Sequence, residues 1–124
     1  MRALFAGGIA LLVVSSAMAA DNACASDKRV VAECFETRGR LRINANGRLY
    51  LWPVGSDRML TVRYDDATAM PDPALPANVA SALKASTDVF ADYRVCPLSK
   101  YEPGKRQSVC VASASRLAAR PNGN

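Results

Sequence analysis

The chain has 124 residues, four cysteines and no histidine, and its formal net charge is +5. A chain of this length forms one domain with a modest core, so covalent cross-links would add usefully to its stability. Without histidine, a Ser–His nucleophile pair is excluded and the common zinc sites are unfavourable. The mild positive charge mainly aids solubility, so its distribution along the chain is more informative than its sum.

The first 19 residues have the pattern of an export signal. Arg2 is followed by an apolar run over 3–14 and then by Ala17 and Ala19, which fit the small-residue rule for signal peptidase. Cleavage after Ala19, with Ala20 as the alternative, would remove 19 of the 124 residues, leave 105 and lower the charge from +5 to +4. The apolar run is shorter than the ~20 residues that a membrane span needs. We therefore predict a periplasmic or secreted protein without a membrane span; a buried N-terminal helix is the competing interpretation.

The stretch from Cys34 to Tyr64 predicts three consecutive antiparallel strands, around which the rest of the fold is organised. Polar and apolar side chains alternate over 35–43, so three arginines share one face of the first strand and the apolar side chains share the other. Gly39 lies on the apolar face and indicates a bulge or a tight bend. Asn46-Gly47 predicts a type I′ hairpin turn. The second and third strands are expected over 48–52 and 59–64.

The second half of the chain predicts one short helix and two more strands. Pro71, Pro73 and Pro76 exclude a central strand or a long helix from the segment that contains them. Pro76 suits the start of a helix whose apolar stripe carries Val79 and Leu83. The expected segments are a connector over 65–76, a helix over 77–85, strands over 89–96 and 107–114, a loop over 97–106, a helical turn over 115–119 and a frayed tail over 120–124.

The expected elements follow the order strand, strand, strand, helix, strand, strand, which is the order of a five-stranded OB-like barrel. The chain also carries Cys34-Phe35, Arg38-Gly39-Arg40-Leu41, Arg58-Met59-Leu60, Val95-Cys96-Pro97-Leu98 and Ser108-Val109-Cys110-Val111. With these motifs it resembles small exported OB-fold-type proteins of proteobacteria that have no assigned function. The resemblance implies a mainly β, disulfide-stapled single domain over 20–119 and an export route, and it carries no activity.

Four cysteines remain after cleavage, and an even number in a small exported chain implies two disulfides. In an OB-like barrel the last two strands form a hairpin, which brings Cys96 opposite Cys110 and leaves Cys24 to pair with Cys34. The same fold pairs the first strand with the fourth, which brings Cys34 near Cys96 and leaves Cys24 for Cys110. We favour the first pairing, and the second stays open.

The candidate binding surface combines arginines with aromatic side chains. OB-like barrels bind oligomers across the second and third strands and at the loops between strands one and two and between strands four and five. One of those loops here, over 97–106, carries Lys100 and Tyr101. Guanidinium groups beside aromatic rings suit anionic ligands. The predicted ligand-binding residues are Arg38, Arg40, Arg42, Tyr50, Trp52, Arg58, Arg63, Lys105 and Arg106.

Each of these residues also has a purely structural interpretation. A row of arginines blunts the aggregation of an exposed sheet, and a lone Trp is commonly half-buried under a loop. Asp65, Asp66 and Asp72 are candidates for acid/base chemistry or calcium binding. Adjacent carboxylates diverge at a strand end, however, so we expect a solvated turn there. We predict no catalytic residue, no metal and no cofactor.

Two functions follow from these patterns. The first is a non-catalytic binding module in the periplasm, with an anionic glycan, lipopolysaccharide or an acidic protein surface as its partner; nucleic acid is not expected outside the cytoplasm. The second is a protein-interaction accessory of the cell envelope, such as an inhibitor or assembly factor, that uses an exposed apolar edge. Salt distinguishes them, because rising ionic strength weakens contacts between charges and not apolar contacts.

Overall fold

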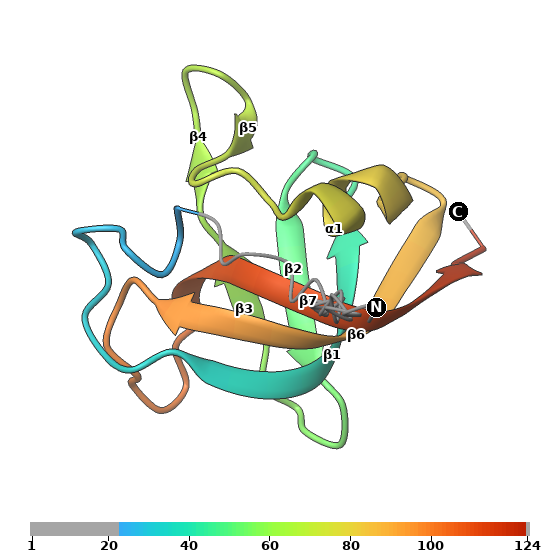
Figure 1. The fold of residues 1–124 in the computed structure, drawn as a ribbon. Helices are drawn as coiled ribbons and strands as arrows, with labels where there is room; N and C mark the ends of the chain where they lie inside the picture. The colour runs from blue at the N-terminus through green and yellow to red at the C-terminus, as the bar shows by residue number, and fades with distance from the viewer. Residues whose placement is uncertain (1–22, 124) are drawn as a thin grey trace, which may run out of the picture.

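The computed structural model describes residues 23–123 (Figure 1). The predicted export segment and its cleavage site lie outside the described residues, as does Asn124. The described part is mainly β, with one short helix, as predicted. Its elements are β1 (Phe35–Ile43), β2 (Leu49–Pro53), β3 (Leu60–Val62), β4 (Tyr64–Asp65), β5 (Met70–Pro71), α1 (Ala77–Ala82), β6 (Thr87–Pro97) and β7 (Gln107–Pro121).

Five strands form a closed ring of hydrogen-bonded neighbours in the order β1-β2-β3-β7-β6, and β6 pairs back with β1. The predicted meander is confirmed, because β1 pairs with β2 and β2 with β3, both antiparallel. β6 and β7 form a long antiparallel hairpin, and β3 meets β7 in parallel. A small hairpin of β4 and β5 stands away from the ring (Figure 1). It begins at Tyr64, the last residue of the predicted third strand, and otherwise lies in the segment predicted to be a connector.

The alternation predicted for β1 and β2 is confirmed and explains the core. Leu41 faces Leu51 across the β1–β2 pair, and both side chains are fully buried inside the ring. Gly39 lies in an unbroken register with both neighbouring strands, so the bulge that was one of the two features expected there does not occur. Instead Gly39 permits a close approach, since a Cβ there would lie 2.8 Å from Leu51 Cδ1 and 3.2 Å from Trp52 O.

The hairpin turn between β1 and β2 occurs where it was predicted, but it is not a type I′ turn. Gly47 has a positive φ of 81°, whereas Asn46 does not. The Gly47 N–H donates to Asn44 O, and the Asn44 N–H donates to Arg48 O. A single left-handed glycine is therefore enough to reverse the chain here.

Helix α1 begins where it was predicted and ends three residues earlier. Pro76 occupies the N-cap position, and Val79 is fully buried against the ring. Leu83 already has extended backbone angles, and its side chain packs on the same core. The helix has six residues, which is less than two turns. Asn78 Nδ2 donates a hydrogen bond to Ala114 O of β7 at 2.8 Å, which ties α1 to the sheet.

The helical turn predicted over 115–119 is wrong, because β7 continues through Pro121. Its partner β6 begins at Thr87, which pairs with Pro121, so the hairpin satisfies the backbone of both strands to their ends. Arg120 and Pro121, which were expected in the tail, therefore belong to the strand. Two irregularities interrupt the register, and Arg116 takes a positive φ of 52° at one of them.

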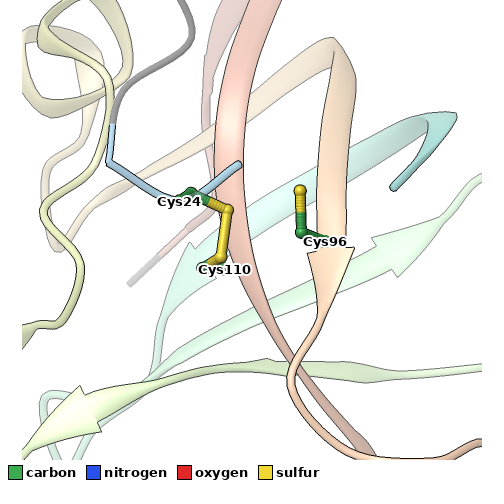
Figure 2. Close-up of side chains that lie close together, drawn as sticks. All are labelled: Cys24, Cys96 and Cys110. Atoms are coloured by element: carbon green, nitrogen blue, oxygen red, sulfur yellow. A yellow bond between two sulfur atoms is a disulfide. The ribbon is translucent and has the colours of Figure 1, made fainter. Parts of the chain in front are cut away.

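The favoured disulfide pairing is wrong, and the alternative is confirmed. Cys24 bonds to Cys110 and Cys34 bonds to Cys96. Cys96 does lie directly opposite Cys110 in the β6–β7 register, as expected. However, Phe35 pairs with Val95 across β1 and β6, so Cys34 reaches Cys96 from the other side. The bonded cysteines form a second apolar cluster with Ala112, separate from the core of the ring. Figure 2 shows three of them, Cys24, Cys96 and Cys110, side by side.

Candidate functional site

The three arginines of β1 form a row, called here the arginine ladder (Arg38, Arg40 and Arg42), that lies against two carboxylates of β6. Arg42 donates to both oxygens of Asp88, at 2.7 and 2.8 Å. Arg40 approaches the same carboxylate at 3.9 Å, and Arg38 contacts Asp92 at 3.4 Å. Each ladder arginine thus has an acidic partner on the neighbouring strand.

Asp88 is only 5% exposed, so its charge depends on the groups that contact it. The hydrogen bonds from Arg42 are the main cause that lowers its pKa below the usual value; burial opposes this, and Asn122 and Arg40 add to it. The same contact raises the pKa of Arg42. The pKa of Asp92 is lowered mainly by a hydrogen bond from Arg116. The ladder is therefore a charge-compensated part of the β1–β6 pair.

Two aromatic side chains of β2 lie beside the ladder. Tyr50 and Trp52 point to the same side of the strand, with ring centroids 6.1 Å apart. The Arg40 guanidinium lies 4.8 Å from the Trp52 centroid, and Trp52 is half-buried. One face of the Trp52 ring is thus occupied by a neighbour within the fold, which leaves less of it available for stacking on a ligand.

A second group of the predicted residues lines a hollow that we call the loop groove. It has a volume of ≈390 Å³ and lies between the β2–β3 connection and the β6–β7 loop. Arg58, Lys105 and Arg106 bring three cationic side chains into it from two loops that are distant in sequence. Its lining residues are Asp57, Arg58, Met59, Tyr101, Gly104, Lys105 and Arg106.

Arg58 is the most firmly positioned cation of the loop groove. Its guanidinium lies 4.7 Å from the Tyr101 ring centroid and 5.7 Å from that of Phe35. It also donates a hydrogen bond to Oε1 of Gln107, a buried residue whose Nε2 donates to Ser99 O at 3.0 Å. These contacts fix the orientation of the guanidinium without neutralising it.

Arg106 connects the loop groove with the aromatic side chains of β2. Its guanidinium lies 5.3 Å from the Tyr50 centroid, and the residue is exposed. Between residues 23 and 123, neither Arg58 nor Arg106 forms an ion pair with a carboxylate. Lys105 contacts Glu102 at 3.0 Å, but both side chains are largely exposed, so this pair holds the lysine weakly.

Arg63 lies outside the arginine ladder, the β2 aromatic pair and the loop groove. It follows β3, and its positive charge acts on Asp27, where it adds to the effect of Arg29 in lowering the pKa of that carboxyl. Arg29 in turn contacts Asp72 at 3.1 Å. The nine predicted residues are therefore divided by the structure between the arginine ladder, the β2 aromatic pair, the loop groove and this separate charged cluster.

The acidic residues considered for catalysis or calcium lie in ordinary turns and ion pairs. Asp66 contacts Arg48 at 2.8 Å, and Asp65 accepts a hydrogen bond from the Ala67 N–H. In the described part of the chain, the one cluster of three side chains with metal-ligating atoms is Cys24, Cys96 and Cys110. All three are in disulfides, and the thiolate that a metal requires is absent from a disulfide.

Two residues that support the groove could not be assigned from the sequence. From the sequence, Gln107 is an ordinary strand residue and Phe35 a core residue. In the structure Gln107 accepts a hydrogen bond from Arg58, and the Phe35 ring lies beside the Arg58 guanidinium. Their roles depend on the β3–β7 and β1–β6 registers, which no local pattern indicates.

Comparison of the chain with protein-family models, with curated proteins and with solved structures finds no match. Over residues 23–123, no helix has the length and apolar character needed to cross a membrane.

Proposed function

We propose that the protein is a non-catalytic binding module of the cell envelope, in which the loop groove binds an anionic ligand. An acidic glycan is the ligand class that we favour, and an acidic protein surface is the alternative. The observation that carries the proposal is a contrast between two sets of arginines. The ladder arginines have carboxylate partners, whereas Arg58 and Arg106 are held by rings and an amide, with no ion pair among the described residues.

An arginine held in this way is well suited to anions. The aromatic ring covers one face of the guanidinium, while the edge N–H groups that no amide oxygen accepts can donate to a carboxylate, sulfate or phosphate. Pre-ordering by Gln107 and Tyr101 also lowers the entropy that the Arg58 side chain loses on binding. Arg106 and Lys105 are exposed and would complete the contact from the opposite loop.

We also propose that the five-stranded ring is an OB-like barrel and that the protein is exported through its N-terminal segment. The strand order with a parallel β3–β7 pair, and the helix between β3 and β6, support the first statement. The two disulfides support the second, because such bonds persist in oxidising compartments. In such a barrel the β6–β7 loop, which forms one wall of the groove, belongs to the ligand-binding side.

Calorimetric titration with defined probes tests the proposal. Polygalacturonate supplies carboxylates on a glycan, polyglutamate supplies them on a peptide, and neutral dextran is the uncharged control. The oxidised mature domain should bind polygalacturonate. The double variant Arg58→Glu/Arg106→Glu should raise the dissociation constant by about tenfold or more, because charge-assisted hydrogen bonds contribute about 1.5–3 kcal/mol each. Binding should fall steeply between about 0.05 M and about 0.5 M salt.

The matched control is Arg94→Glu/Arg120→Glu. Both residues are exposed, neither lines the groove, and the net charge changes by the same amount. Equal weakening by the two double variants would contradict a localised site and indicate a general charge effect. Binding to polyglutamate alone would reassign the partner to an acidic protein surface, and binding insensitive to salt would favour the apolar protein-interaction function.

A further inference from the structure

Cys96 lies between Cys110, on the neighbouring strand β7, and Cys34, which immediately precedes β1. On one side Cys34 immediately precedes the pair formed by Phe35 and Val95, and it bonds to Cys96 with their Cα atoms 4.1 Å apart. On the other side Cys110 is the direct Cα partner of Cys96 in the β6–β7 register. Cys96 therefore has two possible partners, although it bonds to only one of them.

The sulfur atoms are close enough for exchange. The Sγ atoms of Cys24, Cys96 and Cys110 all lie within 4.8 Å of one another, and Figure 2 shows Cys96 beside the Cys24–Cys110 bond. These three residues are at most 1% exposed, whereas Cys34 is only partly buried. Cys34 is thus the most exposed of the four cysteines, and attack on its sulfur would expel Cys96, whose sulfur lies beside the second disulfide.

We propose that the four cysteines form a thiol–disulfide exchange site that an external dithiol opens at Cys34. A thiolate of the dithiol attacks Cys34 Sγ, so a mixed disulfide forms, the Cys34–Cys96 bond breaks and Cys96 leaves as a thiolate. The Cys96 thiolate then attacks Cys110 Sγ, which forms a Cys96–Cys110 bond and expels Cys24 as a thiolate that takes up a proton. The second thiol of the reagent resolves the mixed disulfide, which releases Cys34 as a thiol and leaves the reagent oxidised. In sum, two electrons and two protons pass from the dithiol to one protein disulfide.

The rearranged bond fits the existing strands. Residues directly opposite on antiparallel strands have Cα atoms about 4.5–5.5 Å apart, which lies within the range that a disulfide spans. The exchange detaches residues 23–34 from both of their covalent anchors. That segment is then held by weaker contacts, among them the Val31 N–H bond to Pro97 O and the Arg29–Asp72 ion pair. The product keeps the five-stranded ring, has one disulfide between β6 and β7, and holds its N-terminal arm by noncovalent contacts alone.

Limited reduction of the oxidised domain with dithiothreitol, followed by alkylation and peptide mass mapping, tests the proposal without any substitution. The four cysteines fall on separate tryptic peptides, over 20–28, 30–38, 95–100 and 107–116. The expected product of two-electron reduction has Cys24 and Cys34 alkylated and the peptides of Cys96 and Cys110 cross-linked. Alkylation at Cys34 and Cys96 with the Cys24–Cys110 bond intact would overturn the proposal, as would loss of both bonds together.

A paired set of variants provides a second test. Oxidised Cys24→Ser/Cys34→Ser should form the Cys96–Cys110 bond and show no thiol that reacts with an alkylating reagent in denaturant. The control is Cys24→Ser/Cys110→Ser, which keeps the native Cys34–Cys96 bond and should also show no reactive thiol. Two reactive thiols in the first variant, when the control shows none, would overturn the proposal because Cys96 and Cys110 would then be unable to pair.

Discussion

Replacing Asp88 with asparagine removes the carboxylate that both Arg40 and Arg42 contact, with little change in side-chain volume. The Asp88 side chain is 7% exposed and that of Arg42 is 30% exposed. Breaking a fully buried ion pair costs about 3–5 kcal/mol. Because Arg42 keeps part of its hydration, we expect Asp88→Asn to lower the free energy of unfolding by about 2–3 kcal/mol. For a domain of this size that is a fall of about 8–20 °C in melting temperature.

The assay is urea unfolding of the oxidised domain, with Asp66→Asn as the matched control. Asp66 also contacts an arginine at 2.8 Å, but its side chain is 83% exposed, so its loss should cost less than about 1 kcal/mol. The pKa of Asp88 is lowered in the folded state, chiefly by Arg42. The stability that the Asp88 carboxylate contributes is therefore fully present above the unfolded Asp pKa of about 3.9. It is lost as the pH falls through the lower folded-state pKa. The difference between wild type and Asp88→Asn should close in acid.

Equal unfolding free energies for wild type and Asp88→Asn at neutral pH would refute this account of the ladder. A difference that stayed constant into acid would refute it as well, because the lost interaction would then not depend on the Asp88 charge. The first result would leave Arg40 and Arg42 without a stabilising role through Asp88 and would return them to the candidate ligand contacts.

Three substitutions in the ring test the packing. Gly39→Ala should lower the free energy of unfolding by about 1–3 kcal/mol, because its Cβ would crowd Leu51 Cδ1 and the Trp52 carbonyl; unchanged urea unfolding would contradict this. Val79→Ala should lower the free energy of unfolding by about 1–2.5 kcal/mol, measured by thermal unfolding, since Val79 is the fully buried contact of α1 with the core. A loss below about 0.5 kcal/mol would mean that the packing of α1 on the core contributes little. Tyr93→Phe should lower the free energy of unfolding by about 0.5–1.5 kcal/mol, measured in guanidinium, because it removes the buried 2.6 Å hydrogen bond from the Tyr93 hydroxyl to Val89 O. A variant more stable than wild type would contradict the contribution of this hydrogen bond.

The sequence predicts local features of this fold well. The alternation over 35–43 places Leu41 inside the ring and the ladder arginines outside, because side-chain direction along a strand depends only on position. The turn at Asn46-Gly47 and the helix start at Pro76 also follow from local backbone preferences. Each of these predictions needs no knowledge of which strands are neighbours.

The features that the sequence does not predict depend on register. Cys96 faces a cysteine on each side, and only the position of the N-terminal segment decides which of the two bonds to it. Asp88 is 46 residues beyond Arg42 in the chain, so the ion pair between them follows from the β1–β6 register alone. For the same reason the sequence could group nine basic and aromatic residues but could not separate those with carboxylate partners from those without.

The measurement that tests the central claim most directly is NMR chemical-shift mapping of the oxidised domain with a short polygalacturonate oligomer, followed at backbone amides and arginine Nε–H groups. The binding proposal predicts that the largest shifts fall on 57–59 and 101–106 and on the Nε–H groups of Arg58 and Arg106. Shifts centred instead on the Nε–H groups of Arg38, Arg40 and Arg42 would contradict the assignment of the loop groove, and the absence of shifts at saturating oligomer would contradict anionic glycan binding.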